Sequence, residues 1–190
     1  GSRIDLTYDH QVYTKAKGWL NAEDVQIGDL ILAPSSIPVF GTLNPEESEI
    51  MRVVDESIFF NCLDTGIFSY CKEALCKALK FLFNEHGRFF AQENLILFHL
   101  KTPQMLKDVH HLLLRLGVWS EMDHLRSKVV IRDETDVMNF LYQIGISMTP
   151  STDVKPLRRW ATVGDITRVG VLDVYDIGVH HEDHNFIAND

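Results

Sequence analysis

The spacing of hydrophobic and polar positions changes twice along the chain. From Arg3 to Pro34, short apolar runs alternate with turn residues, a pattern that predicts short β-strands. The spacing then becomes helical with a few short apolar runs between the helices, until Pro150 and Pro156 interrupt it. From Trp160 onward, short apolar runs return. We therefore predict two β segments, residues 1–40 and 151–190, that enclose a mixed α/β insert, residues 41–150.

The first β segment is predicted to contain several strand pieces separated by turns. A turn at Tyr8-Asp9-His10 separates the first two pieces, and Gly28-Asp29 leads into the most apolar one. The pieces are Ile4 to Leu6, Val12-Tyr13, Gly18 to Leu20 and Leu30 to Ala33. In the last segment, Ala161 to Val163, Ile166, Val169 and Val171 to Val179 have the same β character.

Capping residues mark the helices of the insert. Asn44-Pro45 followed by two glutamates predicts a helix start, and that helix is expected to run to about Phe60. Thr102-Pro103 is a second start of this kind. From Lys72 to Ile144 we predict the order helix, strand, strand, helix, strand, strand, helix. The expected ranges are Lys72–Glu85, a hairpin over Arg88–Leu100, Pro103–Leu116, Val118–Leu125, Lys128–Arg132 and Glu134–Ile144.

Composition narrows the class of protein. The 190 residues carry a net charge of −9, which disfavours general nucleic-acid binding because phosphate affinity comes from clustered Lys and Arg. Three cysteines without metal-ligand spacing argue against a disulfide framework and against zinc. No apolar run is long enough for a membrane span and no signal peptide is evident, so we expect a cytoplasmic protein that does not associate with membranes.

Residues that can carry chemistry gather near the two ends. Thr7 and His10, three residues apart, can place a hydroxyl and an imidazole on one side of a turn, where they can hold a peptide carbonyl and protonate its amide nitrogen. Near the other end, Asp176 and His184 can supply an acid and a base. These four residues are the candidate catalytic set.

The order of these clusters resembles a known family. The stretch "LTYDHQVYTKAKGWLNAEDVQIGDLILAP" resembles the intein region that contains the TxxH motif and the "GW…GD" stretch after it. The stretch "DVYDIGVHHEDHNFIAND" resembles the penultimate intein motif. The resemblance is strongest to inteins that interrupt the replicative DNA helicase of bacteria. It implies the β horseshoe of the Hint superfamily, in which the two ends of the chain meet in one site.

The resemblance implies a role for each candidate residue in cofactor-free protein splicing. Thr7 and His10 fall on the positions that activate the N-terminal scissile peptide, with His10 donating to its amide nitrogen during the N-to-S acyl shift. Asp176 falls on the acid that links this shift to the branching step. His184 falls on the imidazole that assists cyclisation of the terminal asparagine.

The chain departs from the family at both ends. An intein begins with a nucleophilic Cys or Ser well before TxxH and ends with Asn, whereas neither residue stands at its position here. Cys62, Cys71 and Cys76 match no splicing position. We therefore expect splicing only with partners that supply the missing N-terminal and C-terminal intein segments and their flanking helicase exteins.

The insert resembles a homing endonuclease of the LAGLIDADG type. The stretches "PVFGTLNPEESEIMRVVDESI" and "KEALCKALKFLFNEHGRFF" lie where the two signature helices are expected, and "TPQMLKDVHHLLLRLGVWS" resembles the helix after the first hairpin. The predicted fold is thus mixed: an incomplete all-β Hint horseshoe with an inserted α+β half LAGLIDADG domain of order αββαββα.

The metal-binding acids of such nucleases are replaced in this chain. Aligning the signature with Ile50–Ile58 puts Ser57 at the first acid position, and aligning it with Leu79–Gly87 puts His86 at the second. Nearby acids, Asp55, Glu56 and Glu85, are offset by one or two residues, which turns them at least 100° away on a helix. Most of the first half-domain is also absent. We therefore expect a nuclease-dead insert with no metal site.

Two alternatives remain open. The first is a DNA-binding or active homing endonuclease within an intein shell, for which Arg115, Arg126, Lys128 and Arg132 would form a weak basic patch. The second is a fragment with no activity of its own.

Overall fold

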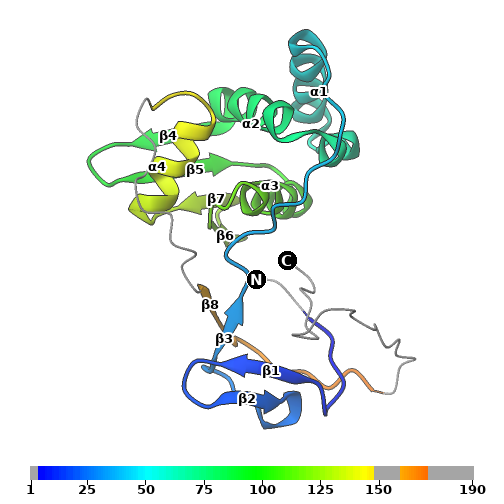
Figure 1. Ribbon diagram of the computed structural model, residues 1–190, viewed down its shortest axis with the longest axis vertical. Coiled ribbons are helices and arrows are strands. Elements are labelled where there is room, and N and C mark those ends of the chain that lie inside the picture. The colour runs from blue at the N-terminus through cyan, green and yellow to red at the C-terminus, as the bar shows by residue number, and fades with distance from the viewer. Residues whose placement is uncertain (1–3, 148–158, 171–190) are drawn as a thin grey trace. The chain divides into compact units, whose positions relative to one another are not determined.

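The computed structural model describes residues 4–147 and 159–170, and it divides the chain into two compact units. Residues 1–34 and 157–190 form the first, which we call the β unit, and residues 35–156 form the second, the α/β unit. Figure 1 shows the elements of both. The described part is a mixture of helices and two antiparallel sheets.

The β unit contains one four-stranded antiparallel sheet in the order β2-β1-β3-β8. A tight hairpin joins β1 to β2, with Gly18 at a φ of +73°, a conformation that suits glycine. The Thr14 hydroxyl closes the hairpin by donating to the Gly18 carbonyl at 2.9 Å. The strands are β1 (Gln11–Thr14), β2 (Gly18–Asn21), β3 (Leu30–Ala33) and β8 (Arg159–Thr162), and the 3-10 helix η1 (Ala22–Asp24) follows β2.

Some of the predicted β character is wrong. Ile4 and Leu6 form no strand, and neither do Ile166 and Val169. Within residues 4–34 and 159–170, no strand lies beside these residues to pair with their backbone groups, so alternating apolar positions alone do not produce a strand there.

Aromatic side chains line one face of this sheet. Tyr13 packs edge-on against Trp19 at 5.3 Å between ring centroids and stacks with Trp160 at 6.2 Å. The register explains both contacts. Tyr13 lies opposite Trp19 on the neighbouring strand β2. On its other side, Thr14 pairs with Ile31, which places Leu32 beside Tyr13, and Trp160 lies opposite Leu32. Among the described residues of the β unit, only Thr14 is buried.

The α/β unit has the predicted order of elements from Lys72 to Gln143. The caps are confirmed in detail at Thr102, whose hydroxyl accepts a hydrogen bond from the Met105 N–H at 3.2 Å. The elements are α1 (Glu47–Phe60), η2 (Thr65–Ser69), α2 (Lys72–His86), β4 (Gly87–Phe90), β5 (Leu95–His99), α3 (Pro103–Arg115), β6 (Glu121–Asp123), β7 (Lys128–Ile131) and α4 (Glu134–Gln143).

The first helix of this unit begins later than predicted. Its N-cap is Glu46 rather than Asn44. Just before Asn44, Leu43 pairs in parallel with Tyr70, and the Cys71 N–H donates to the Leu43 carbonyl at 2.7 Å. The chain stays non-helical from there to Glu46.

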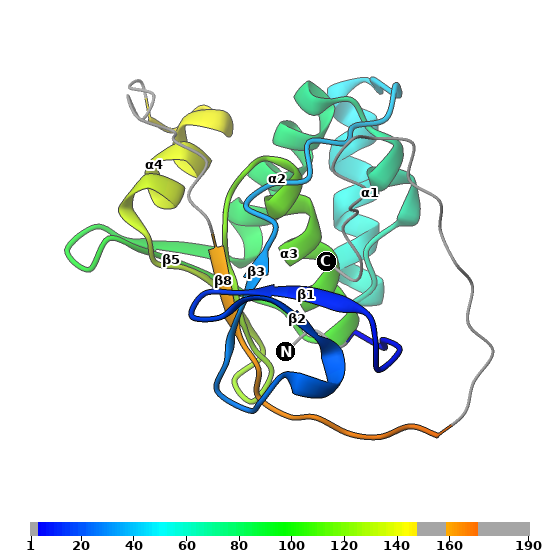
Figure 2. The ribbon, with the colours of Figure 1, turned by 60° about the horizontal axis from the view of Figure 1, so that its bottom comes forward.

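The sheet of the α/β unit is antiparallel in the order β4-β5-β7-β6, and helices pack on it. Ile96, Phe98, Val129 and Ile131 are fully buried. The Phe98 ring packs edge-on against Phe83 of α2 and Phe140 of α4, at 5.8 and 5.7 Å between centroids, and these two rings contact each other at 5.6 Å. Helix α1 packs against α2, which completes the core (Figure 2).

Candidate functional site

The TxxH residues form a turn that leads directly into β1. The His10 N–H donates to the Thr7 carbonyl at 3.1 Å, and Tyr8 and Asp9 occupy the turn. Thr7 is half-buried and His10 is exposed. The predicted turn is therefore confirmed, and the backbones of Thr7 and His10 close it at the end of the hairpin.

Two backbone amides of the 3-10 helix η1 donate hydrogen bonds to this turn. The Ala22 N–H donates to the His10 carbonyl at 2.7 Å, and the Glu23 N–H donates to the Tyr8 carbonyl at 3.0 Å. These contacts could not be predicted from the sequence because they depend on the register of β1 against β2. No side-chain pattern in the sequence indicates them.

The other two candidate residues, Asp176 and His184, lie outside the described residues. Their convergence with Thr7 and His10 stays a prediction.

The "GW…GD" stretch has a local structural role. Gly28 has a φ of +93°, and the Asp29 carboxylate accepts from the Gln26 N–H at 2.9 Å and from Lys17 at 3.2 Å. The hydrogen bond from the Gln26 backbone lowers the pKa of Asp29; desolvation opposes this shift, and Lys17 adds to it. Asp29 thus fixes the turn that leads into β3.

The position of the first expected metal ligand holds a buried structural hydroxyl. Ser57 is 3% exposed, its hydroxyl donates to the Val53 carbonyl at 2.7 Å, and it accepts from the Asp64 N–H at 3.0 Å. The neighbouring acids Asp55 and Glu56 are exposed, and Glu56 pairs with Arg52 at 2.7 Å. Both face solvent rather than the interior of the unit.

The second expected ligand position, His86, is the last residue of α2. Gly87 follows it with an extended conformation, and a Cβ there would overlap the Phe83 ring and crowd the Phe83 carbonyl oxygen. Gly87 is therefore required by packing. Within residues 4–147 and 159–170, no group of three or more His, Cys, Asp or Glu side chains is arranged to hold a metal ion.

The basic residues of the suggested DNA-binding patch have partners within the protein. Arg132 pairs with Glu121 at 3.2 Å and Arg126 with Asp123 at 3.9 Å. Arg115 donates to the Phe68 carbonyl at 2.7 Å and lies over the Phe68 ring. The ion pairs partly neutralise Arg126 and Arg132, and Arg115 is directed toward Phe68, so fewer positive charges are available to bind phosphates.

A small concentration of positive charge remains on the sheet of the α/β unit. Lys128 lies opposite both His99 and Asp123 in the register. Burial, together with the nearby charges of Lys128 and Arg88, lowers the pKa of His99. His99 is therefore biased toward its neutral form and adds little to this charge.

In the part of the chain that the structure describes, no helix combines the length and the apolar character needed to cross a bilayer.

A scan against protein-family models and a search of curated proteins gave no match to this chain.

Proposed function

We propose that the β unit belongs to an intein-like protein-splicing domain that acts when N-terminal and C-terminal segments complete it. The observation that carries the proposal is the turn of Thr7 and His10, in which the motif residues lie three positions apart and the imidazole is exposed. The proposal also draws on the resemblance of residues 173–190 to the penultimate intein motif.

The chemistry is acyl transfer without a cofactor. A supplied nucleophile at the N-terminal junction attacks the preceding carbonyl, and His10 donates a proton to the departing amide nitrogen. Thr7, beside it, orients the scissile peptide. Asp176 links this step to branching, and His184 assists asparagine cyclisation at the other junction.

The test is to add the missing intein segments, with flanking exteins, to the full chain and to follow ligation by mass spectrometry. Loss of a general acid typically costs on the order of 10²- to 10⁴-fold in rate, so we expect His10→Ala to suppress thioester formation by about this factor. His124→Ala removes another exposed histidine, in the α/β unit, and is expected to leave the rate unchanged. Normal splicing by His10→Ala would contradict the role of His10.

We propose in addition that the α/β unit is a homing-endonuclease remnant without nuclease activity. This proposal draws on the αββαββα order and on Ser57 and His86 at the two expected acid positions. The measurement is magnesium-dependent cleavage of DNA that carries the uninterrupted insertion site. Cleavage would replace this proposal with an active endonuclease, whereas a folded chain that neither splices when completed nor cleaves is an inert fragment.

A further inference from the structure

We propose that the backbone N–H of Ala22 positions the TxxH turn and thereby holds His10 in its reactive orientation. This inference rests on the proposed splicing function and assigns a positioning role to a residue that the motif does not include.

The hydrogen-bond register of the hairpin determines which backbone amides face the turn. Gln11 lies opposite Asn21, so the next rung of the ladder joins His10 to Ala22, and this is the 2.7 Å bond from the Ala22 N–H to the His10 carbonyl. One residue farther along, the Glu23 N–H reaches past His10 to the Tyr8 carbonyl at 3.0 Å. Two consecutive amides of η1 therefore hold two carbonyls of the same turn.

The constraint matters because the imidazole of His10 is carried by the backbone of this turn. The backbone conformation at His10 limits the rotamers of its side chain and sets where the imidazole lies. The bond from Ala22 fixes the peptide group of His10 itself, whereas the bond from Glu23 fixes the turn two residues earlier. Ala22 is thus the closer of the two anchors to the imidazole.

The structure offers a substitution that removes this donor alone. Ala22 is the first residue of η1, and Asn21 before it is extended, with φ of −66° and ψ of 149°. Proline is well tolerated at a first helical position and requires an extended residue before it. Ala22→Pro therefore fits the local backbone and deletes the N–H, and the exposed His10 carbonyl can then bond to water.

The activity experiment compares the two ends of the completed chain. We expect Ala22→Pro to slow thiol-induced cleavage at the N-terminal junction by about 10- to 100-fold, as expected for a misplaced catalytic group, and to leave asparagine cyclisation at the C-terminal junction unchanged. A general folding defect would slow both reactions. Ala22→Ser keeps the backbone N–H and is expected to cleave at the N-terminal junction at the wild-type rate.

Glu47→Pro is the matched control for proline itself. Glu47 is the first residue of α1, follows an extended residue and lies in the α/β unit. We expect it to leave both cleavage rates unchanged.

A second measurement uses the chain without added segments. Backbone order parameters from NMR should fall from about 0.85 toward about 0.6 at residues 8–10 in Ala22→Pro, while β1 and β2 stay rigid. Unchanged order parameters, or an unchanged N-terminal rate, would overturn the inference. If the completed wild-type chain does not react at all, the proposed function fails, and the order parameters alone decide whether Ala22 positions the turn.

Discussion

Ser57 stands where the LAGLIDADG resemblance predicts a metal-binding acid, and its hydroxyl serves packing instead. Its hydroxyl joins the last turns of α1 to the segment that follows, through bonds to Val53 and Asp64. A carboxylate at this buried position would need a cation or a donor to offset its desolvation. The hydroxyl needs neither, because it donates to one backbone group and accepts from another.

We expect Ser57→Ala to lower the free energy of unfolding by about 1–3 kcal/mol, because the Asp64 N–H loses its acceptor. Ser57→Asp should destabilise the α/β unit at least as much, since it places a charge at a site that is 3% exposed. Urea denaturation followed by circular dichroism measures both effects. Ser48→Ala, on the exposed face of α1, is the control and should change stability by less than about 0.5 kcal/mol. Equal stability of the Ser57 and Ser48 variants would show that the Ser57 bonds contribute nothing.

The predictive power of the sequence is uneven at the residue scale. The turn from Thr7 to His10 could be predicted because local spacing and turn residues determine it. The anchors at Ala22 and Glu23 could not, because any residue except proline has a backbone N–H. Which N–H faces the turn depends on the register of β1 against β2, and the residue types alone do not determine that register.

At the scale of elements, local signals were sufficient where a helix starts and ends by its own chemistry. Helix α3 begins at Pro103, directly after the Thr102 cap, and α4 begins after Asp133, whose carboxylate accepts from the Thr135 N–H at 3.0 Å. The start of α1 was mispredicted: Asn44 has the residue type of a cap, but the helix begins at Glu47, after the extended Glu46. Just before this stretch, Leu43 pairs with Tyr70, a partner distant in sequence that no local pattern specifies.

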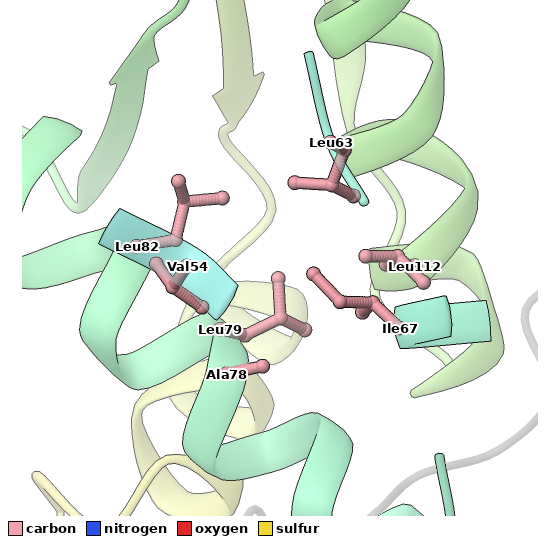
Figure 3. Close-up of a pocket in the computed structure, with 7 residues that line it drawn as sticks. All are labelled: Val54, Leu63, Ile67, Ala78, Leu79, Leu82 and Leu112. Atoms are coloured by element: carbon pink, nitrogen blue, oxygen red, sulfur yellow. The ribbon is translucent and has the colours of Figure 1, made fainter. Parts of the chain in front are cut away.

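The helices of the α/β unit leave a small apolar cavity between them. It has about 10 Å³ of free space and is lined only by aliphatic side chains, drawn in Figure 3. A space this small is at the lower limit for one water molecule and offers it no hydrogen-bond partner, so we expect it to be dry. The lining residues are Val54, Leu63, Ile67, Ala78, Leu79, Leu82 and Leu112.

Two substitutions at this cavity should change stability in opposite directions. Leu79→Ala enlarges the cavity and should cost about 2–5 kcal/mol, whereas Val54→Ile adds one methylene group and should gain up to about 0.8 kcal/mol. Urea denaturation of the α/β unit measures both. Leu125→Ala removes the same atoms as Leu79→Ala from a side chain that is 99% exposed, and should have little effect. A destabilised Val54→Ile would mean that the space cannot accept a methyl group.

At the scale of the whole molecule, the described residues of the two units differ in how much apolar surface they bury. The α/β unit has a continuous core that includes Ile50, Leu75, Phe98 and Phe140, all essentially inaccessible to solvent. The described part of the β unit buries only Thr14, and Trp19 and Leu32 are 57% and 45% exposed. Hydrophobic stabilisation grows with buried apolar area, so stability is concentrated in the α/β unit.

The chain should therefore unfold in two steps, with the β unit first. Its three tryptophans allow a direct test, because Trp19 and Trp160 lie in the β unit and Trp119 lies in the α/β unit. In urea, fluorescence of Trp119→Phe should change at a lower midpoint than fluorescence of a Trp19→Phe/Trp160→Phe variant.

Circular dichroism supplies the internal check, because all the described α-helices belong to the α/β unit. The helical signal should follow Trp119 in every variant. If the fluorescence and helical signals share one midpoint, the two units unfold as one cooperative body, and the concentration of stability in the α/β unit is wrong. Separate midpoints would also mean that a change confined to the β unit, such as Ala22→Pro, can be measured while the α/β unit stays folded.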